Sequence, residues 1–269
     1  MVKKLGFDAK LMKCTEWLAT NANPPSALIE ELLPAEPGEY ILVAGRTGIG
    51  KSILTMHMAL CLATGTLFYG LRCQKVTVGH IVLEGGEANI RDRLLKILSQ
   101  YKGWEETYKF ELKEPFLLLE KHEEEFRRFF EGCRVIIIDN LKQVTGSKYL
   151  KTDYANWWTK GYMRLIADMG AVGIITNHVR KQRNDELIEP GDVYSLKGST
   201  EYVDAASAVI LLERKPQQHG FRGRFMPVEQ DRVMLYWAKL RIANKELEPL
   251  ELMRNYQKAS LDPIPTATL

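Results

Sequence analysis

"GRTGIGKS", residues 45–52, is the most specific motif in this 269-residue chain. It fits the pattern G-x-x-x-x-G-K-[ST], in which glycines let backbone N–H groups turn inward around phosphate oxygens. The apolar run "YILVAG" (40–45) precedes it, and the helical run "SILTMHMALCLA" (52–63) follows it. Because the motif requires a strand before it and a helix after it, we expect a phosphate-binding loop at the start of that helix.

The same loop predicts a nucleotide and a metal ion. Lys51 is spaced to reach the terminal phosphates, and Ser52 carries the hydroxyl that such loops give to Mg²⁺. A second metal ligand is expected from Asp139, which ends the buried strand "RVIIIDN" (134–140). Arg46 is unusual in this position, where small or polar residues are common. We expect ATP and Mg²⁺ as ligands, with the nucleotide held by Gly45, Arg46, Thr47, Gly48, Ile49, Gly50, Lys51 and Ser52.

Five short apolar runs alternate with helical patterns, at 40–45, 80–86, 134–140, 171–177 and 207–213. Strands that are apolar on both faces and alternate with helices indicate a mainly parallel sheet with helices on both sides. After Glu213 the pattern changes to the short segments "RFMPVEQ" (224–230), "DRVMLYWAKLR" (231–241) and "LEPLELMRN" (247–255). These segments predict antiparallel strands at one edge, so the expected fold class is α/β.

The chain divides into one large domain and two short end segments. Residues 1–37 contain a possible helix over 9–19 and then four prolines, which is typical of an arm or linker. Residues 38–258 hold the alternating pattern of the ATPase domain, and 259–269 lack periodicity and are expected to form a tail. We find no internal repeat.

Composition narrows the setting of the protein. The formal charge of +3 is too small to indicate nucleic-acid binding by itself. The four cysteines have no metal-ligand spacing, so we expect reduced thiols. Charged residues interrupt every apolar stretch, and the first residues do not resemble a secretory signal. These features predict a cytoplasmic protein without a membrane association.

Hydrolysis of ATP requires a group that orients or deprotonates the attacking water. Many phosphate-loop enzymes carry a glutamate directly after the metal-binding aspartate, but Asn140 occupies that position here. Glu84 is the best candidate, because it follows the apolar run 80–83 and precedes a double glycine. A residue there emerges at the carboxyl edge of a parallel sheet, where ligands bind. The alternative is that Glu84 is only a turn residue.

This arrangement resembles the RecA-like ATPases, and within them the hexameric replicative helicases of the RepA type from plasmids and phages. The resemblance covers residues 39–241 and rests on segments in the family's order. They are "AGRTGIGKS" (44–52), "GHIVLEGGEANIRDRL" (79–94), "RVIIIDNL" (134–141), "VGIITNHVRK" (172–181), "LKGSTEYVDAASAVILLER" (196–214) and "VMLYWAKLRI" (233–242).

The resemblance implies roles for further residues. Glu84 matches the catalytic base, and His178 matches a sensor that responds to the γ-phosphate. Lys239 and Arg241 match the lysine and the arginine finger that such rings present to the nucleotide of the next subunit, so hydrolysis is expected to depend on assembly. Their two-residue spacing puts both on one strand face. Two basic residues that protect an edge strand are the alternative.

Two segments match those that line the central channel in the family. The first, 141–162, combines basic residues with aromatic ones; for Trp157 and Trp158 we favour packing over base stacking. The second, 178–200, is a long polar connection, which is either a DNA-contacting loop or merely solvated. The candidate DNA-binding residues are Lys142, Lys148, Lys151, Arg180, Lys181, Arg183 and Lys197.

We therefore expect a ring-forming ATPase, hexameric by resemblance, that moves on single-stranded DNA and separates strands. Any primase or loader is expected to be a separate protein. Two other functions fit the same core. One is a RecA-like recombination or repair ATPase, and the other is a regulatory or assembly scaffold that uses ATP without motor activity. A small-molecule kinase fits less well, because no lid segment is evident.

Overall fold

A nine-stranded sheet forms the centre of the computed structural model, which describes residues 26–180, 189–214, 231–243 and 246–264. Six strands are parallel, and β9 to β11 add an antiparallel edge, which confirms the predicted α/β class. In order across the sheet they are β5 (Tyr108–Leu112), β4 (Val78–Val82), β6 (Val135–Asp139), β7 (Val172–His178), β3 (Tyr40–Gly45), β8 (Ala208–Arg214), β9 (Arg232–Leu240), β10 (Leu250–Asn255) and β11 (Ser260–Pro263).

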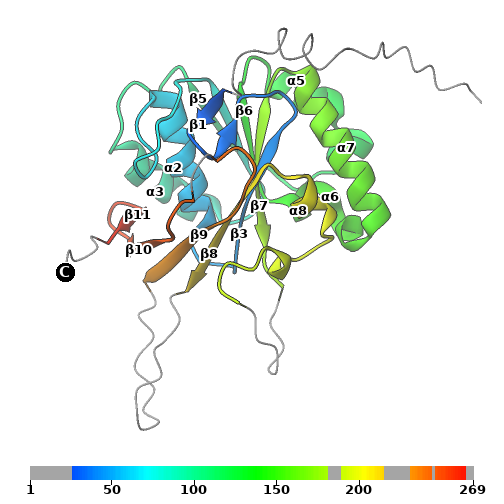
Figure 1. Ribbon diagram of the computed structural model, residues 1–269. Helices are drawn as coiled ribbons and strands as arrows, with labels where there is room; N and C mark the ends of the chain where they lie inside the picture. Colours follow the sequence, from blue (N-terminus) through cyan, green and yellow to red (C-terminus); the bar gives the residue numbers. More distant parts are fainter. Residues whose placement is uncertain (1–25, 181–188, 215–230, 244–245, 265–269) are drawn as a thin grey trace, which may run out of the picture.

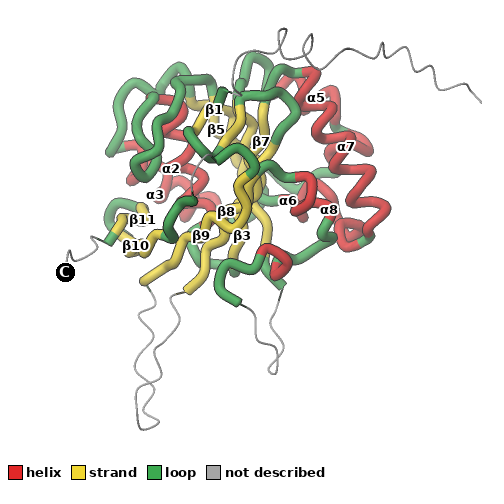
Figure 2. The backbone as a smooth tube through the Cα atoms, in the orientation of Figure 1, coloured by secondary structure: helices red, strands yellow, loops and turns green. Residues whose placement is uncertain are grey.

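Helices cover both faces of this sheet (Figures 1 and 2). On one face lie α2 (Lys51–Thr64) and α3 (Glu87–Leu98), and on the other lie α5 (Glu123–Phe129), α6 (Leu141–Thr145), α7 (Thr152–Asp168) and α8 (Glu201–Ala205). Short turns complete the set: α4 (Leu118–Lys121), η1 (Gly146–Leu150) and η2 (Val193–Ser195). No helix in the described part of the chain combines the length and the apolarity needed to cross a membrane.

The central strands are apolar on both faces because each face packs against a helical layer. In β3, Val43 joins the cluster under α2, whereas its neighbour Leu42 joins the cluster under α7 and α8. Both side chains are fully buried. Successive strand residues point to opposite faces, so a strand in the middle of such a sandwich needs an uninterrupted apolar run. This is the run by which the strand is recognisable in the sequence.

Packing extends beyond both predicted domain boundaries. Before residue 38, β1 (Ala27–Ile29) pairs with β2 (Leu33–Pro34), and Ile29 forms a bridge with Cys73. After residue 258, β11 pairs with β10 and buries Leu261, so residues assigned to a tail complete the sheet. The helix expected over 9–19 and the segment 224–230 lie outside the described residues.

The two tryptophans of α7 have different environments. Trp158 is fully buried and stacks on Tyr162, with ring centroids 5.0 Å apart. The expected packing role is thus confirmed for Trp158. Trp157 is different, because 49% of its surface is exposed, beside the ring of Tyr154.

Candidate active site

Four neighbouring strands bring the predicted catalytic residues to one edge of the sheet. Gly45 at the end of β3 lies opposite His178 at the end of β7, and Asp139 at the end of β6 lies opposite Val82 on β4. Glu84 follows β4 by two residues. Parallel strands end at the same edge, and ligands of open α/β sheets bind there. Because their strands end at the same edge, Gly45 and His178 are neighbours although more than 130 positions separate them in the sequence.

The phosphate-binding loop joins β3 to α2 with backbone angles that favour glycine. Gly48 has φ of 77° and Gly50 has φ of 119°, which are strained for other residues. Lys51 begins α2 and is 6% exposed. Its Nζ donates to the carbonyl of Gly45 at 3.0 Å and lies 3.3 Å from His178 Nδ1. Burial lowers the pKa of the Lys51 ammonium, while nearby carboxylates oppose that change.

Asp139 and Ser52 form a donor set that fits Mg²⁺. Asp139 is 1% exposed, and its Oδ1 accepts a short hydrogen bond from Thr176 Oγ1. Its Oδ2 is buried and has no hydrogen-bond partner among the described residues. Burial raises the pKa of this carboxyl group, while the hydroxyls of Ser52 and Thr176 lower it. A buried carboxylate oxygen without a partner next to a serine hydroxyl suits an oxygen-seeking dication.

Glu84 lies within reach of two polar side chains from neighbouring strands. Its Oε1 is 3.6 Å from His178 Nε2, which in turn lies 3.4 Å from Asn140 Nδ2. The hydrogen bond from His178 lowers the pKa of Glu84 most, burial opposes it, and Asn140 adds a further hydrogen bond; the result is a pKa of about 2. A carboxylate with so low a pKa is charged at neutral pH and suits the orientation of a water molecule.

An open cavity of about 600 Å³ surrounds this cluster. The phosphate-binding loop, Glu84 and His178 line one side, and α3 and β10 line the other. Arg254 and Tyr256 come from β10 and its turn, and Arg254 Nη2 donates to the Gly48 carbonyl at 2.5 Å. Neither residue is predicted from the sequence to belong to this site. They belong to no local motif, and only the pairing of β10 with β9 brings them to the loop.

A family model described as an AAA domain matches residues 8–184, which is more than half of the chain. The chain belongs to this AAA-domain family. Two solved structures with the same fold are an ATPase domain and a DnaB-like replicative helicase solved for its interactions with primase. The first is 12% identical with a TM-score of 0.61, covering 93% of this chain and 96% of that chain. The second is 13% identical with a TM-score of 0.62, covering 96% and 68%.

The search of curated proteins found no match. The family match shows an AAA domain, and the two solved structures share the α/β fold expected from the sequence. The matched range contains the phosphate-binding loop, Glu84, Asp139 and His178. It ends before Lys239 and Arg241, and the predicted roles of all these residues, inside the range and beyond it, stay predictions.

Lys239 and Arg241 lie far from the phosphate-binding loop of their own AAA domain. Arg241 N–H donates to the carbonyl of Ser207, whose N–H donates to that of Tyr40, at the opposite end of β3 from Gly45. Both side chains reach the carboxyl end of α8, where Lys239 Nζ donates to the Asp204 carbonyl at 2.9 Å and Arg241 donates to the same carbonyl. Both side chains therefore lie on the same side, with Arg241 one residue beyond the end of β9. Neither residue lies at the phosphate-binding loop of its own chain.

The predicted DNA-binding residues that the structure describes are all exposed: Lys142, Lys148, Lys151, Arg180 and Lys197. Lys142, on α6, lies two residues after Asn140, which contacts His178. Lys197 N–H donates to the His178 carbonyl at 2.7 Å, and Val179 bridges Leu196, so the second polar segment starts and ends beside His178. Lys181 and Arg183 lie outside the described residues.

Arg46 is exposed at the beginning of the loop. Its positive charge lowers the pKa of Glu213, near the end of β8, although burial has the larger effect and raises that pKa. Arg46, whose role the sequence did not indicate, is thus close enough to the Glu213 carboxylate on neighbouring β8 to affect its pKa.

Proposed function

We propose that this AAA domain is the motor subunit of a cytoplasmic ring, a hexamer, that hydrolyses ATP between subunits and moves along single-stranded DNA during replication. The observation that carries the hydrolytic part is the cluster of Lys51, Asp139, Glu84 and His178 from four neighbouring strand ends. The likeness in fold to helicase ATPase domains supports the motor part.

The chemistry follows from the positions of the side chains. Glu84 orients a water molecule and receives its proton as the water oxygen forms a bond to the γ-phosphorus. The bond between that phosphorus and the β,γ-bridging oxygen breaks, and ADP keeps the electron pair. Lys51 stabilises the charge that develops on the phosphate oxygens. When Mg²⁺ is bound by Ser52 and Asp139, it neutralises charge on the β- and γ-phosphates.

The separation of Arg241 from its own nucleotide site supports hydrolysis between subunits. An arginine that stabilises the transition state must approach the γ-phosphate, and Arg241 lies at the other end of β3. In a ring, this side chain is available to the nucleotide of a neighbour. The carbonyls at the end of α8 hold it in a defined place, which reduces the entropy lost when the interface forms.

His178 connects the nucleotide to the basic segments. The two ring nitrogens of His178 face Lys51 and Glu84, one each. Its backbone carbonyl accepts a hydrogen bond from the N–H of Lys197. A change in phosphate occupancy that turns the ring therefore also moves the chain toward Arg180 and Lys197. The exposed basic residues are suited to phosphates of single-stranded DNA without regard to its sequence.

The proposal is tested by measuring ATP turnover with and without single-stranded DNA, together with the mass of the assembly bound to a non-hydrolysable ATP analogue. A hexamer whose turnover rises with DNA is the expected result. A ring that hydrolyses ATP at the same rate with and without DNA contradicts the motor and favours a scaffold. An open filament on DNA favours a recombination or repair ATPase.

A further inference from the structure

Gln143 contacts the oxygen of Glu84 that His178 does not approach. Gln143 Nε2 donates to Glu84 Oε2 at 3.5 Å, whereas His178 Nε2 faces Oε1 at 3.6 Å. The Gln143 amide is the third hydrogen-bond donor that lowers the pKa of the Glu84 carboxyl, after His178 and Asn140. Donors on both oxygens fix the plane of a carboxylate, and 40% of the Glu84 side chain is exposed, so few other contacts restrain it.

Backbone hydrogen bonds hold Gln143 in position. Its N–H donates to the Asn140 carbonyl at 3.1 Å, which ties it to the residue after Asp139. Its own carbonyl accepts the N–H of Phe116 at 3.2 Å, from the loop that follows β5. Phe116 is thus the one described residue outside the Asn140–Gly146 turn shown to bind the Gln143 backbone.

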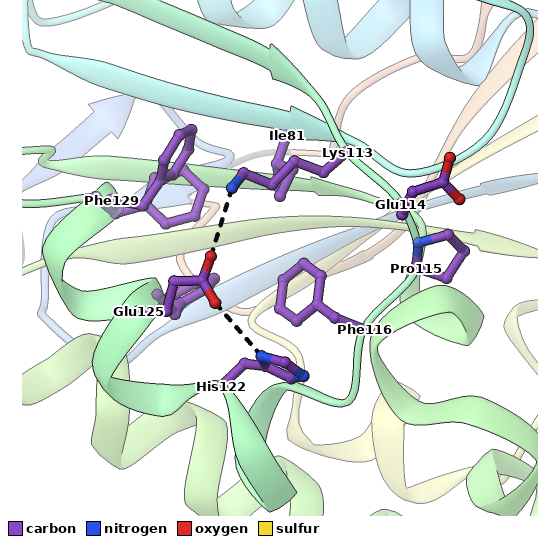
Figure 3. A pocket seen from close by; sticks show the side chains of 10 residues that line it. Ile81, Lys113, Glu114, Pro115, Phe116, His122, Glu125 and Phe129 are labelled. Atoms are coloured by element: carbon purple, nitrogen blue, oxygen red, sulfur yellow. Dashed lines mark hydrogen bonds and ion pairs between the residues drawn. The ribbon is translucent and has the colours of Figure 1, made fainter.

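Phe116 lines an apolar cavity of about 350 Å³ on the α5 face of the sheet (Figure 3). Its ring meets the ring of His122 edge-on at 5.6 Å, and Phe129 lies across the cavity. Glu125 joins His122 and Lys113 at the cavity rim, at 3.4 Å and 3.7 Å. The ring of Phe116 is half-buried and packs against the apolar cluster under α7 and α8, and this contact restrains Phe116 and the N–H that donates to Gln143.

We propose that Gln143 is a positioning residue for Glu84, and that Phe116 sets the position of Gln143. The inference rests on the proposed role of Glu84 in orienting water. Gln143 holds the second carboxylate oxygen so that the first faces the attacking water. Loss of this contact leaves the second oxygen of Glu84 without the Gln143 amide, so the carboxylate can tilt, and it removes no group that holds the nucleotide.

The first test is Gln143→Met, which keeps the length and the helix propensity of the side chain but removes the amide. We expect kcat to fall about tenfold while KM for ATP stays within about twofold, because orientation is lost and binding is not. Gln143→Glu places a like charge beside Glu84 and should lower kcat further. A kcat for Gln143→Met equal to that of the wild type overturns the proposal.

The second test is a double-mutant cycle between Phe116→Ala and Gln143→Met. If Phe116 acts through Gln143, the double variant has about the same kcat as Gln143→Met alone, so the effects are not additive. Phe129→Ala is the matched control, because it removes a ring from the same cavity without a bond to Gln143. It should destabilise the fold similarly, by urea unfolding, and leave kcat unchanged. Additive effects of Phe116→Ala and Gln143→Met contradict the connection.

Glu84→Gln separates the role of Glu84 from that of Gln143. If Glu84→Gln keeps wild-type turnover, the proposed role of Glu84 fails, and the role of Gln143 fails with it. If Glu84→Gln loses turnover and Gln143→Met does not, only the positioning role fails. Should Phe116→Ala prove unfolded, Phe116→Leu keeps an apolar side chain in the cavity, and the Gln143→Met result still decides the main claim.

Discussion

At the scale of single residues, the nucleotide site differs from many phosphate-loop enzymes at the position directly after the metal-binding aspartate. Asn140 cannot deprotonate water, and its side chain points instead to His178, at 3.4 Å. The charged carboxylate comes from the next strand, at Glu84, and three donors hold it there. The sequence allowed this residue to be found because a glutamate that ends a buried strand must emerge at the ligand-binding edge.

Replacing Glu84 by glutamine should separate binding from turnover. Glu84→Gln keeps the shape of the side chain and one acceptor oxygen but cannot take a proton, so kcat should fall by roughly 10² to 10⁴. ATP affinity should stay within about twofold, because Lys51 and the loop are unchanged. Glu87→Gln, in the first turn of α3, is the control. Turnover that survives in Glu84→Gln would move the water-orienting role to another group.

His80 should make the fold sensitive to mild acid. It is fully buried in β4 beside Tyr108, and burial lowers its pKa to about 3 from 6.5. Below pH 6.5 the unfolded chain takes up a proton that the folded chain refuses, so stability falls as pH falls. The loss should be about 2 kcal/mol between pH 7.5 and 5, and His80→Gln should remove that part in urea unfolding at both pH values. Equal pH dependence in both proteins would contradict it.

At the scale of elements, the strands with uninterrupted apolar runs could be predicted, and so could β10, but β11, the second strand of the C-terminal hairpin, could not. β3, β6, β7 and β8 are buried on both faces, so their sequences alone identify them. β11 has only four residues. It is stabilised as a strand by pairing with β10 and by the packing of Leu261 against α2. Such contacts are not encoded in local periodicity, and this is why Arg254 and Tyr256 were missed.

The hairpin should contribute to ATP binding through Arg254. The guanidinium donates to the Gly48 carbonyl and adds positive charge beside the phosphate-binding loop. Arg254→Ala should therefore weaken ATP binding roughly tenfold, the order expected for one charged hydrogen bond. Arg232→Ala is the control, because it removes the same charge from neighbouring β9, where Arg232 pairs with Glu251. Equal affinities of the two variants, measured by calorimetry, would exclude a specific role.

At the scale of the whole molecule, a complete catalytic site is proposed to need two subunits, and mixing variants tests this. Lys51→Ala removes the phosphate ligand, and Arg241→Ala removes the residue offered to a neighbour, so each protein alone should be nearly inactive. In an equal mixture, one interface in about four pairs an intact loop with an intact arginine, so about a quarter of wild-type turnover should return. Arg241 also binds carbonyls at the end of α8 in its own chain. If Arg241→Ala abolishes turnover only by disturbing α8, mixing with Lys51→Ala subunits would not restore turnover. Mixed rings without activity would therefore show that Arg241 acts within its own subunit.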